Sequence, residues 1–477
     1  EGYLFFSTGL ANVRMANTTS FTGMDFKDES VRYRDPEDVT PEDSRGMVKL
    51  SKKVTNTSYD AYPWRSKMFL ELPSYDDPLA NHYSYRREQY IGPFKHGETF
   101  SHYQANLERR YGEPTEGAHL KKWIDVTQDR FLNWGFTSFG NWAGYEFYHE
   151  NRMPYFANGW VIGDFKTVRS GSDYWGPMPD VFDPEFTRRS KVTVAVIAEE
   201  VKENPWCIGV FIDNEKSWGL PGSINSQYAL ALDGLSKKLS ESPLKREYIR
   251  LLKEKYKDID ALNAAWETEI KNWAALEAGI DYKKKESFTA GMEADLSLLL
   301  ETFANKYFQV IHDALAEVMP NHLYMGCRFA SWGMSKETRS AAKKYVDVFS
   351  YNFYEEAIGD KKNAFNIIPL TEDIGFIIAI NQAVKRNEII CFNVDRTMTD
   401  ANNDTADFLG REASFPTGVY KLALKLKSPI AFISGVKTSK NNYHLNCKPF
   451  NSTKDSQIID LVHQFTLYFE MITKAYP

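Results

Sequence analysis

Short runs of nearly continuous hydrophobic residues recur along the first three quarters of the chain and alternate with amphipathic stretches. The clearest amphipathic stretch covers residues 295–319, where apolar positions repeat at the spacing of one helix face. Apolar strands that alternate with helices are typical of a parallel sheet covered by helices, so the pattern predicts an α/β fold. The expected buried strands are residues 3–15, 135–142, 155–163, 207–215, 322–331 and 346–354.

Several of these expected strands end in polar or aromatic side chains. Because the carboxyl ends of the strands carry the chemistry in a (β/α) barrel, this clustering is typical of a barrel enzyme. Between strands, the charged stretch 233–259 predicts an exposed helical insertion, and residues 30–60 predict a long loop that shapes the substrate groove. The residues at the strand ends are Asn141, Trp142, Asn214, Glu215, Arg328, Asn352 and Tyr354.

The composition narrows the class of function. The 477 residues are 43% hydrophobic and 14% aromatic, which is enough to bury a substantial core. With a net charge of −6 and no long block of Lys and Arg, the chain indicates neither a nucleic-acid partner nor attraction to an anionic membrane. We find no run of about 18 apolar residues, which a membrane span needs, and no signal peptide at the start. Four widely spaced cysteines without a C-x-x-C pair predict reduced thiols.

Glu215, at the end of an expected strand, suits glycosidic chemistry. A general acid must protonate the leaving oxygen, and burial beside aromatic rings raises the pKa of a glutamate toward that task. Asn214 is placed to hydrogen-bond the sugar hydroxyl next to the reacting carbon. The alternative is a salt-bridged carboxylate among core tryptophans, which the local pattern alone favours. Flat apolar faces for sugar rings are expected from Trp142, Trp160, Trp218 and Trp332.

An ordered series of segments covers residues 1–355 and includes "NWGFTSFGNWA", "MPYFANGWVIGDF", "NPWCIGVFIDNEKSWG" and "PNHLYMGCRFASWG". This series resembles glycoside hydrolase family 50, the β-agarases. The resemblance implies that Glu215 is the acid/base of a retaining mechanism, assisted by Asn214. It also implies an agar-derived oligosaccharide substrate cut at β-1,4 bonds, no metal or other cofactor, and a secreted or periplasmic location. We expect the substrate to be bound by Asn141, Trp142, Trp218, Arg328, Trp332, Asn352 and Tyr354.

The second carboxylate of this mechanism is not identified. A retaining glycosidase needs a nucleophile roughly 5–5.5 Å from the acid, and the resemblance implies one at the end of strand 7, in a Glu-Phe-His-Phe-Gly type segment. No segment after Tyr354 resembles it. Glu355 and Glu356 follow strand 6 directly, and Glu388 precedes its strand. The sequence therefore predicts a partial (β/α)8 barrel that holds strands 1–6 and carries loop insertions.

The C-terminal segment has a different texture, because no tryptophan follows Trp332. Residues 362–477 resemble the later half of the lipid A biosynthesis acyltransferases, on an Asp395–Arg396 pair, "FLG", and "FPTG" opening a helix. No histidine has an aspartate five residues later, so the H-x-x-x-x-D pair of that family is missing. We expect a smaller α/β segment here, joined at residues 356–361 to the barrel-like part.

Three interpretations of the whole chain stay open. The longer resemblance favours a β-agarase-type glycoside hydrolase that is impaired because the strand-7 nucleophile is missing. The first alternative is a non-catalytic fusion, or a chimeric sequence, that keeps some sugar-binding surface. The second alternative is a fragment of a lipid A acyltransferase, against which the missing H-x-x-x-x-D pair argues.

Overall fold

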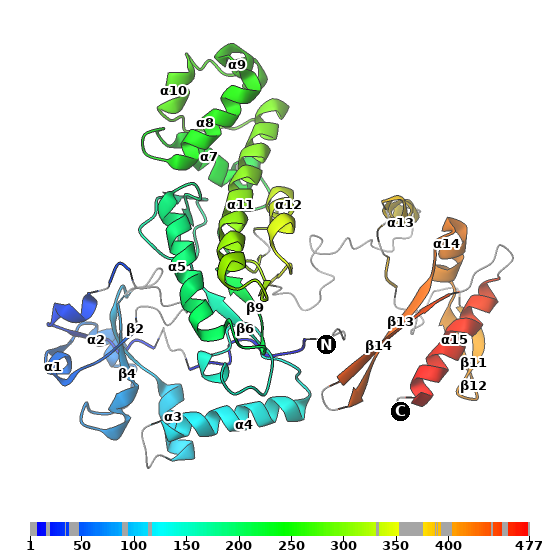
Figure 1. Cartoon of the computed structure of the whole chain (residues 1–477), viewed down its shortest axis with the longest axis horizontal. Helices are drawn as coiled ribbons and strands as arrows, with labels where there is room; N and C mark the ends of the chain where they lie inside the picture. Colours follow the sequence, from blue (N-terminus) through cyan, green and yellow to red (C-terminus); the bar gives the residue numbers. More distant parts are fainter. Residues whose placement is uncertain are drawn as a thin grey trace. The chain divides into compact units, whose positions relative to one another are not determined.

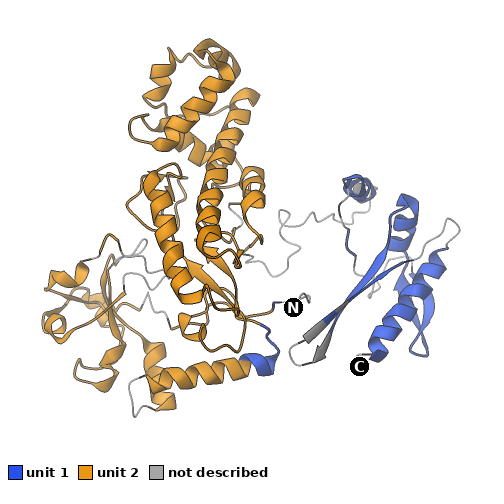
Figure 2. Cartoon of the chain, viewed as in Figure 1, with its two compact units in different colours: residues 1–7, 131–137, 357–477 blue, residues 8–130, 138–356 orange. Residues whose placement is uncertain are grey.

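The computed structural model divides into two compact units by its internal contacts (Figure 2). Residues 8–130 and 138–356 form the larger unit, and residues 1–7, 131–137 and 357–477 form the smaller one. Both units contain helices and strands, so the chain has a mixed α/β fold. The expected join at 356–361 lies outside the described residues and stays a prediction. The structure describes residues 7–15, 20–33, 35–37, 47–87, 94–112, 117–330, 333–352, 375–386, 388, 390–392, 403–439, 442–450 and 457–475.

A three-stranded parallel sheet forms part of the larger unit's core (Figure 1). Its order is β10-β9-β6, and its strands are β6 (Tyr155–Gly159), β9 (Cys207–Ile212) and β10 (Leu323–Tyr324). All five residues of β6 and most of β9 are buried, as expected for strands that are covered on both faces. The sheet confirms the prediction of parallel, apolar strands at these positions.

Backbone hydrogen bonds extend this sheet on both sides. The N–H groups of Ser138 and Gly140 donate to the carbonyls of Thr8 (3.2 Å) and Leu10 (2.9 Å). The N–H of Phe139 donates to Pro154, just before β6, at 2.9 Å. Beyond β10, Phe329 and Tyr351 form a parallel bridge. The segments that the sequence predicts as strands therefore follow one another in chain order.

Long helices pack against the sheet and one another (Figure 1). α5 (Pro184–Val201) begins with Asp183 as its N-cap and Pro184 in its first turn, which favours helix initiation. Gly159 allows β6 to approach α5 closely, because a Cβ there would lie 2.5 Å from Ile197. The predicted helix over 295–319 is confirmed as α11 (Ala290–Val318), which contacts α5.

The predicted helical insertion after β9 is present, but it is less exposed than expected. It consists of α7 (Ala229–Ser236), α8 (Pro243–Tyr256), α9 (Ile259–Trp266) and α10 (Trp273–Glu277). Six of the eight residues of α7 are buried, and α8 also buries six residues, five of them without charge. The insertion therefore has its own apolar core. Its many charged residues had led to the prediction that it is exposed.

A buried carboxylate connects this insertion to α11. Asp295 of α11 accepts hydrogen bonds from the Lys255 ammonium (2.5 Å), the Tyr256 hydroxyl (2.6 Å) and the Trp266 indole (2.7 Å). Because a buried carboxylate is costly unless its oxygens are hydrogen-bonded, these three donors make the contact stable. The insertion is thus anchored to the long helix through polar contacts as well as apolar ones.

The expectation of a loop over residues 30–60 is wrong in part. β1 (Met24–Phe26) pairs with β3 (Ser58–Asp60), and β2 (Met47–Lys49) lies in a separate three-stranded antiparallel sheet with β4 (Tyr83–Arg86) and β5 (Gly97–Phe100). These elements bury a small core of their own, which the polar composition of the segment did not indicate. The residues of that core are Phe26, Val31, Val54 and Tyr85.

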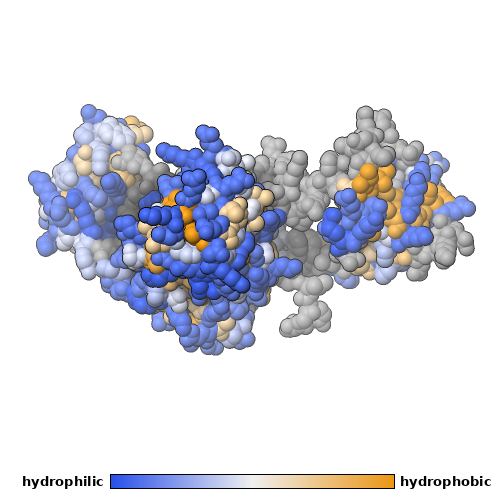
Figure 3. All heavy atoms as spheres, turned by 90° about the horizontal axis from the view of Figure 1, so that it is seen from above, coloured by the Kyte–Doolittle hydropathy of each residue, from blue (hydrophilic) through white to orange (hydrophobic). Residues whose placement is uncertain are grey.

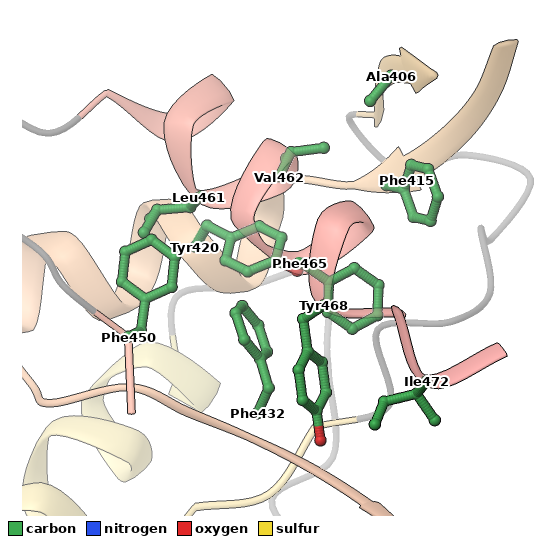
Figure 4. Close-up of a cluster of buried hydrophobic side chains, with 10 residues drawn as sticks. All are labelled: Ala406, Phe415, Tyr420, Phe432, Phe450, Leu461, Val462, Phe465, Tyr468 and Ile472. Carbon is green, nitrogen blue, oxygen red and sulfur yellow. The ribbon is translucent and has the colours of Figure 1, made fainter. Parts of the chain in front are cut away.

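The smaller unit is built from two antiparallel hairpins and helices (Figure 1). The predicted helix after "FPTG" is confirmed, and a longer helix follows over residues 458–475, whereas Asp395 and Arg396 lie outside the described residues. Aromatic and aliphatic side chains from both hairpins and from the last helix form one core (Figure 4). The elements are α13 (Gly375–Lys385), β11 (Asn403–Phe408), β12 (Arg411–Pro416), α14 (Gly418–Leu426), β13 (Ala431–Ser439), β14 (Asn442–Pro449) and α15 (Ile458–Ala475).

Hydrophilic residues dominate the visible face of the molecule, and hydrophobic residues gather in limited areas (Figure 3). Among the helices of the described residues, none is both long and apolar enough to cross a membrane. The remaining α-helices and β-strands of the described residues are α1 (Lys52–Thr55), α2 (Pro63–Ser66), α3 (His102–Tyr111), α4 (Ala118–Trp134), α6 (Ile224–Gln227), α12 (Lys336–Tyr345), β7 (Thr167–Val168) and β8 (Met178–Pro179).

Candidate active site

Glu215 lies in a tight turn directly after β9. Asp213 (φ 63°) and Glu215 (φ 47°) both adopt left-handed backbone conformations, which are uncommon for residues with a side chain. The turn is held from two sides. The N–H of Asp213 donates to Gly159 at 2.8 Å, and the N–H of Glu215 lies 3.0 Å from the carbonyl of Cys327 and 3.2 Å from that of Arg328. Backbone strain that neighbouring segments hold in place is typical of functional sites.

Asp213 stabilises this turn from within. Its buried carboxylate accepts hydrogen bonds from the Tyr307 hydroxyl (2.6 Å) and the Val161 N–H (3.1 Å). The ammonium of Lys216 lies 4.0 Å away. Burial, and the negative charge of Asp213, raise the pKa of Tyr307 well above its ordinary value, so its hydroxyl stays a donor. Asp213 therefore connects the end of β9 to α11.

The carboxyl group of Glu215 is buried, with a relative exposure of 5%, and has a hydrogen-bond donor on each oxygen. The Asn352 amide donates to Oε1 at 2.5 Å, and the Trp175 indole donates to Oε2 at 3.2 Å. The same amide lies 3.5 Å from Oδ1 of Asn214, which is also buried. The structure therefore brings together Asn214, Glu215 and Asn352, as the sequence predicts for strand ends. Trp175 also belongs to this group. It was not predicted from the sequence, because it lies in a loop and not at the end of a strand.

A row of aromatic rings continues from this carboxyl group. The rings of Trp175 and Trp160 are 6.4 Å apart, and Trp160 stacks on Trp142 at 5.7 Å. Tyr174 meets Trp175 edge to face at 4.8 Å, and the Arg14 guanidinium lies 5.2 Å from the ring centre of Trp142. Such rings offer extended apolar faces with polar edges.

Trp218 does not belong to this row. It is 2% exposed, and its ring stacks on Phe308 at 5.5 Å and meets Tyr307 edge to face at 5.1 Å. The expectation that Trp218 binds a sugar ring is therefore wrong for this structure, because a side chain in the core has no free face. It packs α11 against the turn that carries Glu215.

The other residues predicted to bind substrate are Asn141, Arg328, Trp332 and Tyr354. Asn141 is buried, and its amide nitrogen has no hydrogen-bond partner within the described part of the chain. Arg328 is half-buried, with its guanidinium 5.7 Å from the ring centre of Phe211. Trp332 and Tyr354 lie outside the described residues. Sugar binding by these residues stays a prediction.

Three glutamates that follow Asn352 in the sequence were considered for the second carboxylate. Glu355 and Glu356, which follow the last strand-like segment, lie outside the described residues. Glu388 belongs to the smaller unit and forms an ion pair with Arg386 at 2.6 Å. Within the described ranges, no group of three or more His, Cys, Asp or Glu residues has the arrangement needed for a metal ion.

The larger part of the chain is similar to known agarases. "Beta-agarase B" from Vibrio sp. (strain JT0107) is 40% identical over 362 residues, which is 76% of this chain and 35% of that protein. "Beta-agarase A" from the same strain is 34% identical over 369 residues, 75% of this chain and 32% of that protein. The solved structure of an exo-β-agarase shares 52% identity with a TM-score of 0.71, and covers 74% of this chain and 47% of that one. The chain thus spans about a third of the length of these curated relatives.

The C-terminal part is similar to a different family. Residues 359–466 match the family described as bacterial lipid A biosynthesis acyltransferase. The two similarities support the two resemblances that the sequence carries, and they explain why its texture changes after Trp332. The chain therefore joins a longer segment that is homologous to the β-agarases to a C-terminal segment that matches the bacterial lipid A biosynthesis acyltransferases.

Proposed function

We propose that the larger unit carries the acid/base half of a β-agarase-type glycoside hydrolase. The substrates are agarose and neoagaro-oligosaccharides, cut at β-1,4 bonds by a retaining mechanism with two carboxylates. The observation that carries the proposal is the buried carboxyl group of Glu215, with Asn352 and Trp175 on its two oxygens. Homology to the β-agarases supports the choice of substrate.

The parallel segments of the larger unit are, in this proposal, strands 1–6 of a (β/α)8 barrel. The strand-like segments begin near Thr8 and end near Asn352, and Glu215 follows the fourth of them. Catalytic groups of such barrels lie at the carboxyl ends of the strands. The position of Glu215 and the order of the hydrogen-bonded segments support this assignment.

Each group has a defined role in the proposed reaction. Glu215 protonates the leaving oxygen in the first step and removes a proton from water in the second. Asn214 donates to the sugar hydroxyl beside the reacting carbon, where hydrogen bonds strengthen as positive charge develops. Trp142, Trp160 and Trp175 provide faces for sugar rings along the row that leads to Glu215.

The nucleophile is unidentified, which keeps a second candidate function in view. The smaller unit buries its own apolar core between its hairpins and α15, so it has the features of a separate segment. This supports a domain boundary at residues 356–361 and favours, as the alternative, a chain that binds agar-derived oligosaccharides without cutting them. The proposed hydrolase is impaired to the extent that the strand-7 carboxylate is missing.

The test measures hydrolysis of neoagarohexaose by the full chain, with binding measured separately by calorimetry. Glu215→Gln is expected to lower the rate by about 10²–10⁴-fold, the usual contribution of a general acid, and to keep binding. The matched control is Glu254→Gln, because Glu254 is an exposed residue of α8, and it is expected to keep the wild-type rate. Binding without any turnover by the wild type would establish the binding-only alternative. Absence of binding would refute both functions.

A further inference from the structure

We infer that Trp175 is a positioning residue for Glu215, held in place by the helical insertion that follows β9. The inference rests on the proposed role of Glu215 as the acid/base. Trp175 lies in the turn between β7 and β8, which pair as a short antiparallel hairpin. Its indole N–H donates to Oε2 of Glu215, and its ring is 39% exposed. The ring also meets Tyr174 edge to face at 4.8 Å, so it is held by an aromatic contact as well as by the hydrogen bond to Glu215.

The turn that carries Trp175 has a fixed internal geometry. Oδ1 of Asp173 accepts hydrogen bonds from the Ser170 N–H (2.9 Å) and hydroxyl (3.1 Å). The Asp173 carbonyl accepts from the N–H of Gly176 at 3.0 Å, and its Oδ2 pairs with Arg169 at 3.3 Å. Asp173 thus closes the turn on both sides of Trp175, which restricts where the indole can point.

Both ends of this hairpin are attached to the helical insertion. The Arg169 N–H donates to Oδ2 of Asp233, on α7, at 3.0 Å. At the other end, Asp180 accepts from the Ser242 hydroxyl (2.6 Å) and the Leu244 N–H (3.0 Å) at the start of α8. Asp180 and Asp233 are both buried, and removing one partner of a buried, hydrogen-bonded carboxylate is costly. The insertion therefore fixes the hairpin, and through it the indole.

A third contact ties the hairpin to the segment of Glu215 itself. The hydroxyl of Ser217, two residues after Glu215, donates to the carbonyl of Ser172 at 3.2 Å. The segment that carries Trp175 and the segment that carries Glu215 are thus joined by a second hydrogen bond, between Ser217 and Ser172. This arrangement holds the carboxyl group in one orientation with little freedom to rotate.

A donor on a carboxylate oxygen stabilises the ionised form and lowers its pKa. Charged residues also lie on the segments next to Glu215. Asp213 pairs with Tyr307, the Lys216 ammonium faces Asp213, and the Arg328 guanidinium lies over an aromatic ring. The Asn352 amide on Oε1 and the Trp175 indole on Oε2 both orient the carboxyl group of Glu215.

The experiment compares Trp175→Phe with the wild type and with a control, Trp64→Phe, in the full chain. Phenylalanine keeps a flat aromatic ring and removes the N–H donor together with the second ring of the indole, a loss that Trp64→Phe reproduces. Trp64 is an exposed tryptophan that stacks on Phe94, and its substitution is expected to leave hydrolysis and titration unchanged. The titration of Glu215 is followed by NMR with carboxyl-¹³C glutamate, and the signal is assigned by its loss in Glu215→Gln. The basic limb of the pH–rate profile on neoagarohexaose is measured in parallel.

We expect the Glu215 midpoint to rise by about one to two pH units in Trp175→Phe, as for loss of one hydrogen bond to a charged group. The basic limb of the profile moves in the same direction. A shift in the NMR titration without wild-type hydrolysis supports the positioning role and refutes the proposed function. An unchanged midpoint in Trp175→Phe overturns the inference, whether or not hydrolysis depends on Glu215. If the Trp175 ring had only a structural role, the Glu215 midpoint would be the same in Trp175→Phe as in the control Trp64→Phe.

Discussion

Glu98, on β5, makes the stability of the larger unit dependent on pH. Its side chain is buried, and its carboxyl oxygens accept hydrogen bonds from the Thr22 hydroxyl (2.8 Å) and the Tyr75 hydroxyl (2.6 Å). Burial raises the pKa of Glu98 to about 7, from an ordinary value of 4.5, although the two hydroxyl donors act in the opposite direction. The folded protein therefore holds a proton on Glu98 that the unfolded chain releases near pH 4.5.

The sign and size of the effect follow from this difference. Between pH 4.5 and pH 7 the folded state binds more protons than the unfolded state, so the free energy of unfolding falls as the pH rises. The pKa difference corresponds to a loss of about 3 kcal/mol, complete once the pH exceeds 7, at 1.36 kcal/mol per pKa unit. Below pH 4.5 both states are protonated, and Glu98 adds no further dependence.

Urea unfolding at pH 5, 6, 7 and 8 tests this prediction against Glu98→Gln, which carries no charge at any of these values. Tryptophan fluorescence is a suitable signal, because no tryptophan follows Trp332 and the C-terminal segment is therefore silent. We expect the stability of the variant relative to the wild type to rise by about 2.5 kcal/mol from pH 5 to pH 8, since part of the full effect lies below pH 5. Parallel pH dependences for the two proteins would refute the reasoning.

Two further predictions concern buried side chains. Trp218→Ala is expected to destabilise the larger unit by about 3–5 kcal/mol, because it leaves a cavity in a dense aromatic cluster. Urea unfolding followed by tryptophan fluorescence measures this loss of stability. A loss below ~1 kcal/mol would contradict the position of Trp218 in the core. Burial raises the pKa of Cys207 and Cys327 to about 12, whereas Cys391 and Cys447 are exposed. An aromatic disulfide reagent at pH 8 should therefore modify the latter two cysteines in the native chain and all four in urea, and fast labelling of Cys207 or Cys327 would be inconsistent with this structure.

Local features of the sequence were sufficient to predict the strands and the place of Glu215 at a strand end. The run of buried residues that forms β9 and the polar residues after it are adjacent in sequence, so their relation depends on strand periodicity alone. The same holds for α11, whose helical spacing spans many turns. The loop expected over residues 30–60 failed because short strands in polar surroundings become stable only through distant partners, such as Tyr85.

The sequence by itself determined the alternation of strands and helices, the position of Glu215 at a strand end and the change of resemblance toward its C-terminal part. Only the tertiary structure decided which side chains meet that glutamate. Trp175 is 40 residues away from it in sequence and Asn352 is 137 residues away, so no local periodicity relates them. Trp175 and Asn352 reach Glu215 because of the order of the parallel segments and because the helical insertion holds the β7–β8 hairpin. Tertiary packing also explains why Trp218 lies in the core and not at the site.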